Sequence, residues 1–474
     1  MTDLTDLGAS ALARMIAAGE TSAAEVMQAH LDRIGAVNGQ VNAIVSLGDP
    51  DTLMAEARAA DQAPRKGWLH GLPLAVKDLQ LTAGIRSTMG SPIFADHVPE
   101  KDGMLSHRLR AEGAILIGKT NVPEYGLGSQ SSNPVFGATA TPYDLSRTSG
   151  GSSGGAASAL AARMLPVADG SDMMGSLRNP AAFCNVYGMR PSYGLVPKDP
   201  EGDSFLHQLS TDGPMARNVE DLARLLETLA RPDPRLPHGR AWEPFAEDLD
   251  RDPRGLRIGW LGDWGGAFPM EPGILETCRS ALEIMADLGC IVEEVAPPFD
   301  ASALWQSWIT LRSWAVATNL SVHHADPRRR DLLKPEAVWE TERGLALSAM
   351  EVHRASVTRS AWFSRAAELF GSYDVLVLPT AQIWPFDKNV LWPKAIGAAE
   401  MDTYHRWMEV VVPASLIGLP AISVPAGFGT DGPGAGLPMG MQLIGPRGAD
   451  RALLRLAQAW HHATDWPAVR PPAL

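Results

Sequence analysis

The segment from Thr148 to Pro180 constrains this chain most, because it places a glycine-rich turn on each side of one apolar stretch. The first turn reads Gly150-Gly-Ser-Ser-Gly-Gly155, and the second reads Gly170-Ser-Asp-Met-Met-Gly-Ser176. Between them, residues 156–167 are rich in alanine and predict a buried helix running into a short strand. Glycine lets a backbone turn sharply and bring its N–H groups close to a ligand. Two such turns joined by one helix can present their serines to a common point, an arrangement suited to acyl transfer.

The surrounding sequence predicts alternating helices and strands. Residues 8–36 predict two amphipathic helices, the second beginning at the capping box Ser22-x-x-Glu25. Further helices are predicted at 105–112, 219–230, 274–288, most of 300–372, and 451–462. Strands are predicted at 72–76, 114–117, 257–261, 291–295, 374–378, 421–424 and 441–444. This alternation favours an α/β fold around a largely parallel or mixed sheet. Since no linker divides the chain, we expect one large domain over residues 1–474.

Charge and cysteine content restrict the cellular context. The 54 acidic and 41 basic residues give a formal net charge of −13, which disfavours a nucleic-acid or anionic membrane surface. Three scattered cysteines predict reduced thiols. The N-terminal stretch, residues 1–7, lacks the basic start and apolar core of a signal peptide, and no apolar run reaches about 18 residues. We therefore expect a cytoplasmic protein with no membrane contact.

Three other motifs compete with an acyl-transfer interpretation. Residues Gly113 to Thr120 fit the P-loop pattern, but their variable positions are Ala-Ile-Leu-Ile, which predict a strand whose N–H groups are already paired. Gly150-x-Ser152-x-Gly154 fits the nucleophile elbow of α/β-hydrolases, yet the preceding residues are too polar for the buried strand this elbow requires. A flexible linker would join two domains, whereas this glycine-rich run leads directly into a helix. The histidines show no metal-ligand pattern, so we expect no metal and no other cofactor.

The two turns resemble the amidase signature, whose usual form is GGSSGG, an alanine-rich helix and then GTDTGGSxRxPA. Residues 71–78 (GLPLAVKD) are similar to the family's lysine-bearing segment, and residues 418–425 and 437–445 resemble its C-terminal pattern. The resemblance spans nearly the whole chain. It implies one mixed, mostly parallel β-sheet covered by helices on both faces. It also implies a core triad region at 70–220 and a C-terminal segment, 300–420, that supplies much of the substrate pocket.

The same resemblance implies a catalytic triad. Ser176 is then the nucleophile, Ser152 relays its proton, and Lys77 is the base. A lysine acts as a base only when neutral, so burial must lower its pKa from about 10.4. The resemblance further implies a cis peptide bond between Gly151 and Ser152, and substrate contacts from Gly151 and Ser153. The backbone N–H groups of Met173, Met174, Gly175 and Ser176 would form the oxyanion hole, with Asp172 and Arg178 as a buried brace.

The expected substrate follows from a departure and from tryptophan placement. Met173 and Met174 replace the Thr-Gly pair that is common in the family, which should reshape the adjoining pocket. Trp384 lies in a proline-rich loop, where core packing is a weaker explanation, so we expect it to contact substrate. We therefore predict an amidase that hydrolyses a hydrophobic or aryl carboxylic amide through an acyl-serine intermediate. The expected binding partner is a small-molecule amide substrate. We expect no nucleic-acid partner, and a homodimer is compatible with the sequence.

The main alternative is the glutaminase (A) subunit of a tRNA-dependent amidotransferase, which shares this fold and triad by resemblance. Such subunits carry a run containing Asp and Asn before the Gly-Leu-Pro motif. This chain has Trp407-Met408-Glu409 and Pro413-Ala414-Ser415 there, so the likeness fails at that stretch. A binding protein without activity is a third alternative, but all three catalytic positions hold competent residues.

Overall fold

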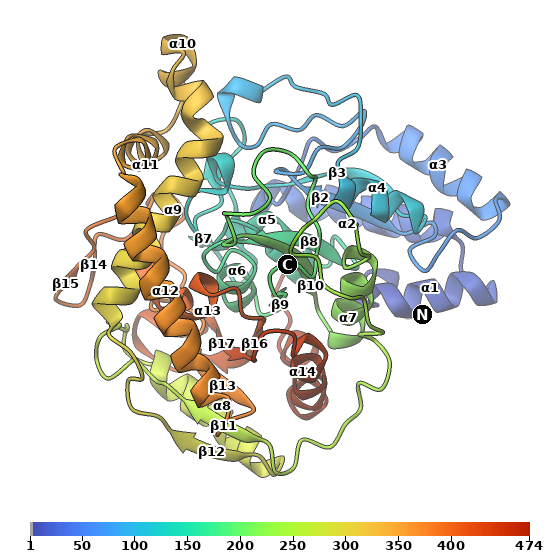
Figure 1. Cartoon of the computed structure of the whole chain (residues 1–474). Coiled ribbons are helices and arrows are strands. Elements are labelled where there is room, and N and C mark those ends of the chain that lie inside the picture. The colour runs from blue at the N-terminus through green and yellow to red at the C-terminus, as the bar shows by residue number, and fades with distance from the viewer. Residues whose placement is uncertain (1–2) are drawn as a thin grey trace.

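An eight-stranded mixed sheet forms the centre of the molecule in the computed structural model, which describes residues 3–474 (Figure 1). Met1 and Thr2, part of the stretch used for the signal-peptide prediction, lie outside the described residues. The strand order is β12-β11-β13-β17-β16-β9-β10-β8. The strands are β8 (Ala168–Asp172), β9 (Tyr187–Arg190), β10 (Thr211–Ala216), β11 (Arg257–Trp260), β12 (Ile291–Glu294), β13 (Val375–Pro379), β16 (Ala421–Phe428) and β17 (Pro438–Ile444).

The sheet is mixed as expected, but the predicted parallel majority is wrong. Only β11 with β12 and β11 with β13 pair in parallel, and the other neighbouring pairs of this sheet are antiparallel. The parallel pair β11 and β12 is joined by the crossover helix α8 (Ile274–Asp287). Parallel neighbours need such a crossover, whereas β16 and β17 follow each other through a short loop and pair as antiparallel strands.

A second, three-stranded sheet carries Lys77 at the end of one of its strands. Its order is β1-β3-β2, with β1 (Ile44–Val45), β2 (Pro73–Lys77) and β3 (Ile115–Thr120). The predicted strands at 72–76 and 114–117 are thus confirmed. β3 contains the P-loop-like residues, and its buried Lys119 donates to Oγ1 of Thr82 at 2.9 Å and to the carbonyl of Gln80. This segment is a paired strand and not a phosphate-binding loop.

Helices cover both faces of the large sheet, as expected. One face packs against α1 (Ala9–Ala18), α7 (Val219–Leu229), α8 and α14 (Asp450–Thr464), around strand residues such as Ile422 and Leu443. The other face packs against α5 (Gly154–Ala161), α6 (Arg178–Phe183), α9 (Ala301–His324) and α12 (Ala349–Leu369). The two glycine-rich turns lead into α5 and α6, the helices on this second face.

The predicted helical region at 300–372 forms one group of helices. Figure 1 shows α9, α11 (Pro335–Leu345) and α12 side by side along one edge of the molecule, with α10 (Pro327–Arg330) protruding beyond them. Trp305, Trp308 and Trp362 are fully buried in this group. They belong to the same apolar cluster as Leu376 and Leu378 of β13.

The remaining elements follow the sequence closely. The predicted capping box is confirmed, because Ser22 and Glu25 exchange hydrogen bonds at the start of α2 (Ala23–Val41). The other helices are α3 (Pro50–Gln62), α4 (Met104–Ala111), α13 (Val412–Leu416) and α15 (Trp466–Val469). Short strand pairs are β4 (Ser132–Asn133) with β5 (Gly137–Ala138), β6 (Ala140–Thr141) with β7 (Asp144–Thr148), and β14 (Ala395–Ile396) with β15 (Ala399–Glu400). Within residues 3–474, no helix combines the length and apolar character needed to cross a bilayer.

Candidate active site

Lys77 ends β2, and its side chain reaches both glycine-rich turns. The Nζ atom lies 2.8 Å from Oγ of Ser152 and 2.8 Å from Oγ of Ser153. It also lies 2.9 Å from Oγ and 3.3 Å from the carbonyl oxygen of Ser171. Lys77 is completely buried. Four protein oxygens therefore hold one buried lysine nitrogen beside the serine of the first turn.

Burial changes the charge of this lysine. Removal from water lowers the pKa of Lys77 from 10.5 to about 7, because burial disfavours the ammonium form. The carboxylates of Asp212, Asp169 and Asp172 oppose this shift. Asp169 also accepts the backbone N–H of Lys77 at 3.1 Å and thereby fixes the end of β2. A substantial fraction of Lys77 is therefore neutral near pH 7, as a base requires.

The first turn is held by its neighbours. The Gly151–Ser152 peptide bond is cis, as the resemblance implied. Oγ of Ser129 accepts the N–H of Gly151 at 3.2 Å and donates to the carbonyl of Gly151. A Cβ atom on Gly151 would lie 3.1 Å from the backbone nitrogen of Gln130. Gly151 and Ser153, which we expected to contact substrate, are both buried, and their contacts are to Ser129 and Lys77.

The second turn connects β8 to α6 and carries Ser176. Gly175 has a φ of 77°, and a Cβ atom there would overlap Oδ1 of Asn179, so only glycine fits. The carbonyl of Ser176 accepts the N–H of Ser153 at 3.1 Å, which ties the two turns together. Ser176 is 7% exposed, against 2% for Ser152 and 0% for Lys77. Of the three predicted catalytic residues, Ser176 is thus the one nearest solvent.

The backbone donors of the second turn differ from expectation at one position. The N–H of Gly175 donates to Oδ1 of Asp172 at 2.8 Å, so this donor is already occupied. The N–H groups of Met173, Met174 and Ser176 have no acceptor among residues 3–474. An oxyanion hole needs donors that are free to bind the developing oxyanion. Gly175 therefore leaves the predicted set, and the assignment of Met173, Met174 and Ser176 to the oxyanion hole stays a prediction.

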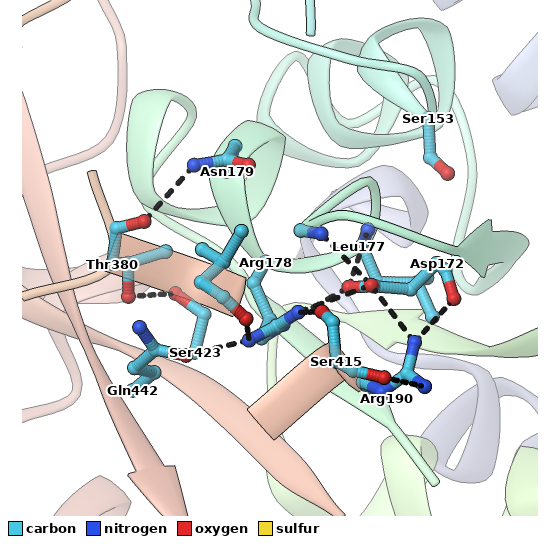
Figure 2. A network of polar contacts seen from close by, with 12 residues as sticks. Ser153, Asp172, Leu177, Arg178, Asn179, Arg190, Thr380, Ser415, Ser423 and Gln442 are labelled. Carbon is cyan, nitrogen blue, oxygen red and sulfur yellow. Dashed lines mark hydrogen bonds and ion pairs between the residues drawn. The ribbon is translucent and has the colours of Figure 1, made fainter. Parts of the chain in front are cut away.

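A buried ionic network braces this turn. Figure 2 shows Asp172 between the guanidinium groups of Arg178 and Arg190. Arg178 donates to both carboxylate oxygens of Asp172, at 3.0 and 3.1 Å, and Arg190 donates at 3.2 Å. Burial favours a raised pKa, but the two arginines hold the pKa of Asp172 well below its usual range. Arg178 also donates to Gln442 and Ser415, each at 2.6 Å, and so links the turn to β17 and α13.

Only one of the two methionines borders open space. Met174 is buried in the core, whereas Met173 is partly exposed and lines a cavity of about 290 Å³. The cavity wall combines apolar groups with charged ones. Its members include Leu209, Ala315, Lys198, Asp199, Glu201 and His207. The wall beside the second turn is therefore more polar than the sequence led us to expect.

Trp384 does not take the position expected of a substrate contact. Its side chain is 2% exposed, its indole N–H donates to the carbonyl of Pro272 at 3.0 Å, and its ring packs on Gly434. The proline-rich loop begins buried at Ile383 to Pro385, whereas Val390 and Leu391 farther along it are exposed. Trp384 is thus a core residue, whereas we expected it to contact substrate.

Two residues that hold the site together were missed. Ser171 supplies two of the four oxygens around Lys77. Ser129 binds both the N–H and the carbonyl of Gly151, the residue before the cis bond. Ser171 lies inside the second glycine-rich turn, so its position was a usable signal. Ser129 lies outside any motif we considered, and only the folded chain places it there. Within the described part of the chain, no group of three or more His, Cys, Asp or Glu side chains could hold a metal ion.

The fold and the buried lysine between two serine-bearing turns agree with what the resemblance to the amidase signature implied, and sequence comparison leads to the same class of amide-hydrolysing enzymes. The family model described as Amidase matches residues 25–454, so the chain belongs to the amidase family and is an enzyme that acts on amide C–N bonds. A bacterial aryl acylamidase of the amidase signature family has a similar structure. Its TM-score is 0.89 at 28% identity, covering 98% of this chain and 99% of that chain.

Curated relatives of the chain are named as A subunits of glutamyl-tRNA(Gln) amidotransferases, not as aryl acylamidases. The relative from Dehalococcoides mccartyi is 33% identical over 503 residues, covering 99% of this chain and 100% of that protein. The corresponding protein of Thermus thermophilus is 36% identical over 484 residues, covering 96% and 97%. Subunits work in assemblies with other proteins. These relatives overturn our expectation of a small-molecule partner alone, without nucleic acid and as a homodimer, and they imply protein partners.

Proposed function

We propose that this amidase hydrolyses a carboxylic amide through an acyl-Ser176 intermediate, with Ser152 relaying a proton to Lys77. The observation that carries the proposal is the 2.8 Å contact between Ser152 Oγ and the buried Nζ atom of Lys77. Serine hydroxyls are weak nucleophiles until a neighbour removes their proton. A lysine with a pKa of about 7 is matched to that task near neutral pH.

The proposed steps conserve protons. Oγ of Ser176 attacks the amide carbon while its proton passes to Oγ of Ser152, and the proton of Ser152 passes to Nζ of Lys77. The free N–H groups of Met173, Met174 and Ser176 stabilise the oxyanion. Lys77 then returns the proton through Ser152 to the departing nitrogen as the C–N bond breaks. Water hydrolyses the acyl-serine by the same relay.

For the substrate, we propose a hydrophobic or aryl amide. Met173, Leu209 and Ala315 provide apolar surface in the cavity beside the second turn. The solved structure of an aryl acylamidase also covers nearly the whole chain. Burial of a phenyl-sized group contributes about 1.5–3 kcal/mol, or roughly ten- to a hundred-fold in specificity.

The second candidate is glutamine hydrolysis by this chain within a tRNA-dependent amidotransferase. The names of the curated relatives favour it, since both of those described above match almost their whole length. Both candidates use the same proposed triad, and they differ in the acyl group and in the assembly. Substrate preference therefore distinguishes them.

The decisive experiment compares an anilide with glutamine as substrates for the full chain. We expect the higher kcat/KM for the anilide, and a higher value for glutamine would support the second candidate instead. Ser176→Ala should lower kcat by about 10⁴-fold or more, and Ser152→Ala by about 10²- to 10⁴-fold. Ser158→Ala is the matched control, since Ser158 lies in α5 and bonds only the carbonyl of Ala140. Wild-type turnover in Ser176→Ala would refute the proposed nucleophile.

A further inference from the structure

A buried cluster formed by Arg312 on α9, Glu340 on α11 and Tyr404 lies next to the second turn and has no place in the proposed steps. Arg312, 3% exposed, donates through Nε to Oε1 of Glu340 at 2.8 Å. Its Nη2 atom donates to the hydroxyl of Tyr404 at 2.6 Å and to Oε2 of Glu340 at 3.3 Å. The hydroxyl of Tyr404 donates to the same Oε2 atom at 2.6 Å. The guanidinium is thus fixed in one orientation by α11 and by the segment after β15.

The remaining edge of this guanidinium lacks an oxygen partner. Within residues 3–474, the one acceptor near Nη1 of Arg312 is Sδ of Met173, at 3.5 Å. A thioether is a weak acceptor, and Nη1 carries two N–H groups. A buried arginine edge usually binds oxygen, because an unpaired buried donor is costly. The Met173 thioether is therefore a poor partner for this edge.

Met173 connects the arginine to the cavity and to the predicted oxyanion hole. Its side chain is partly exposed and lines the 290 Å³ cavity. Ala315 and Thr318, one to two turns after Arg312 on α9, line the same cavity. The backbone N–H of Met173 belongs to the turn that carries Ser176. A ligand in the cavity that displaces this flexible thioether would reach Nη1.

We propose that Nη1 of Arg312 binds a second hydrogen-bond acceptor of the substrate, in place of the Met173 thioether, and that this acceptor is neutral, such as a carbonyl oxygen. The inference rests on the proposed function, because it names a further feature of the same substrate. It makes Arg312 a specificity determinant distinct from the hydrophobic contacts.

Two charge arrangements favour a neutral acceptor over a carboxylate. Glu340 already balances Arg312, so an added anion would introduce uncompensated charge into a buried site. The cavity wall also carries three carboxylates, from Asp199, Glu201 and Asp203, against the single lysine Lys198. An anionic substrate would be repelled by this wall.

Three anilides of matched length test the proposal by calorimetry on the full chain carrying Ser176→Ala, which keeps binding separate from turnover. They are 4-oxopentananilide, with a ketone, pentananilide, with a methylene at that position, and succinanilate, with a carboxylate. We expect 4-oxopentananilide to bind about ten- to a hundred-fold more tightly than pentananilide, as for a hydrogen bond to a charged group. Succinanilate should bind no more tightly than pentananilide.

Variants then assign the effect to Arg312. Adding Arg312→Met with Glu340→Gln should bring the ketone-to-methylene affinity ratio near one. Both ligands are measured on one preparation, so a reduced folded fraction leaves the ratio unchanged. If that protein does not fold, Met173→Leu decides, because it removes the competing sulfur at similar volume and should raise the ratio.

Equal or undetectable affinities for the ketone and methylene anilides would overturn the proposal. So would a ratio preserved without Arg312, a ratio unchanged in Met173→Leu, or tightest binding of succinanilate. Absence of hydrolysis by the wild-type chain would instead refute the proposed function and would leave these affinities interpretable.

Discussion

At the residue scale, the properties of the site depend on the environment of Lys77. A lysine at the end of an apolar strand is ordinarily a surface group whose ammonium reaches water. Here four serine oxygens surround Nζ, and burial lowers the pKa of Lys77 to about 7. Nearby carboxylates limit this fall. The basicity of Lys77 is therefore set by the balance between burial and the carboxylates of Asp212 and Asp169.

The pH dependence of hydrolysis should report this balance. Because neutral Lys77 is the active form, kcat/KM should rise with pH to a plateau above about pH 7 and be about 100-fold lower at pH 5. Among the nearby carboxylates, Asp212 contributes most to stabilising the ammonium form of Lys77. Asp212→Asn should therefore lower the pKa of Lys77 and shift the rising part of the pH profile to lower pH. Asp32→Asn, an exposed carboxylate on α2, is the control. A pH profile measured with an anilide tests this, and a limb that stays in place in Asp212→Asn would contradict it.

At the element scale, one ion-pair network joins pieces that are distant in the chain. Asp172 ends β8, Arg178 begins α6, and Arg190 ends β9. Arg178 extends the network to Ser415 on α13 and Gln442 on β17. Since all of these side chains are buried, each polar group depends on its partners for compensation. The network holds the turn of Ser176 against the large sheet.

Loss of one partner should therefore be costly. Arg178→Met leaves Arg190 as the single arginine paired with the Asp172 carboxylate. We expect the free energy of unfolding to fall by about 3 kcal/mol, the lower value for breaking a buried ion pair. Arg365→Met, which breaks an exposed pair with Glu368 on α12, should cost less than about 0.5 kcal/mol. Urea denaturation of both variants measures the difference. Equal small losses would show that the network contributes little to stability.

At the scale of the whole molecule, the comparisons point to two kinds of relative. The chain aligns along its length with proteins named as subunits of glutamyl-tRNA(Gln) amidotransferases and, in structure, with an aryl acylamidase. The shared fold and the proposed triad do not separate these, because function lies in the acyl pocket and in the assembly.

Relatives that are subunits lead us to expect protein partners for this chain. The full chain, tagged and isolated from its source cells at moderate salt, should elute above the mass of one chain together with proteins of different sequence. Light scattering and mass spectrometry of the eluted peak measure this. The same protein after a high-salt wash is the control for weak adsorption. Elution as a single chain without other proteins would contradict the expectation.

The predicted elements were largely correct because they depend on local signals. The capping box at Ser22, the strand ending at Lys77 and the helix between the turns are each encoded by a few consecutive residues. The prediction that most strands of the sheet pair in parallel was wrong. Whether two neighbouring strands are parallel depends on which strands pair in the folded chain, and local sequence does not specify this. Trp384 was misplaced for a similar reason, since a loop position does not reveal what packs over it.

The sequence by itself determined the family, the elements and the identity of Lys77, Ser152 and Ser176 as candidates, because contiguous motifs carry that information. Tertiary structure alone decided which groups surround them. Ser171 lies beside Lys77, Ser129 binds the carbonyl of Gly151, and Arg312 contacts Met173 although 139 positions separate them in the chain. Such contacts arise from long-range packing of helices and strands, and no local pattern specifies them.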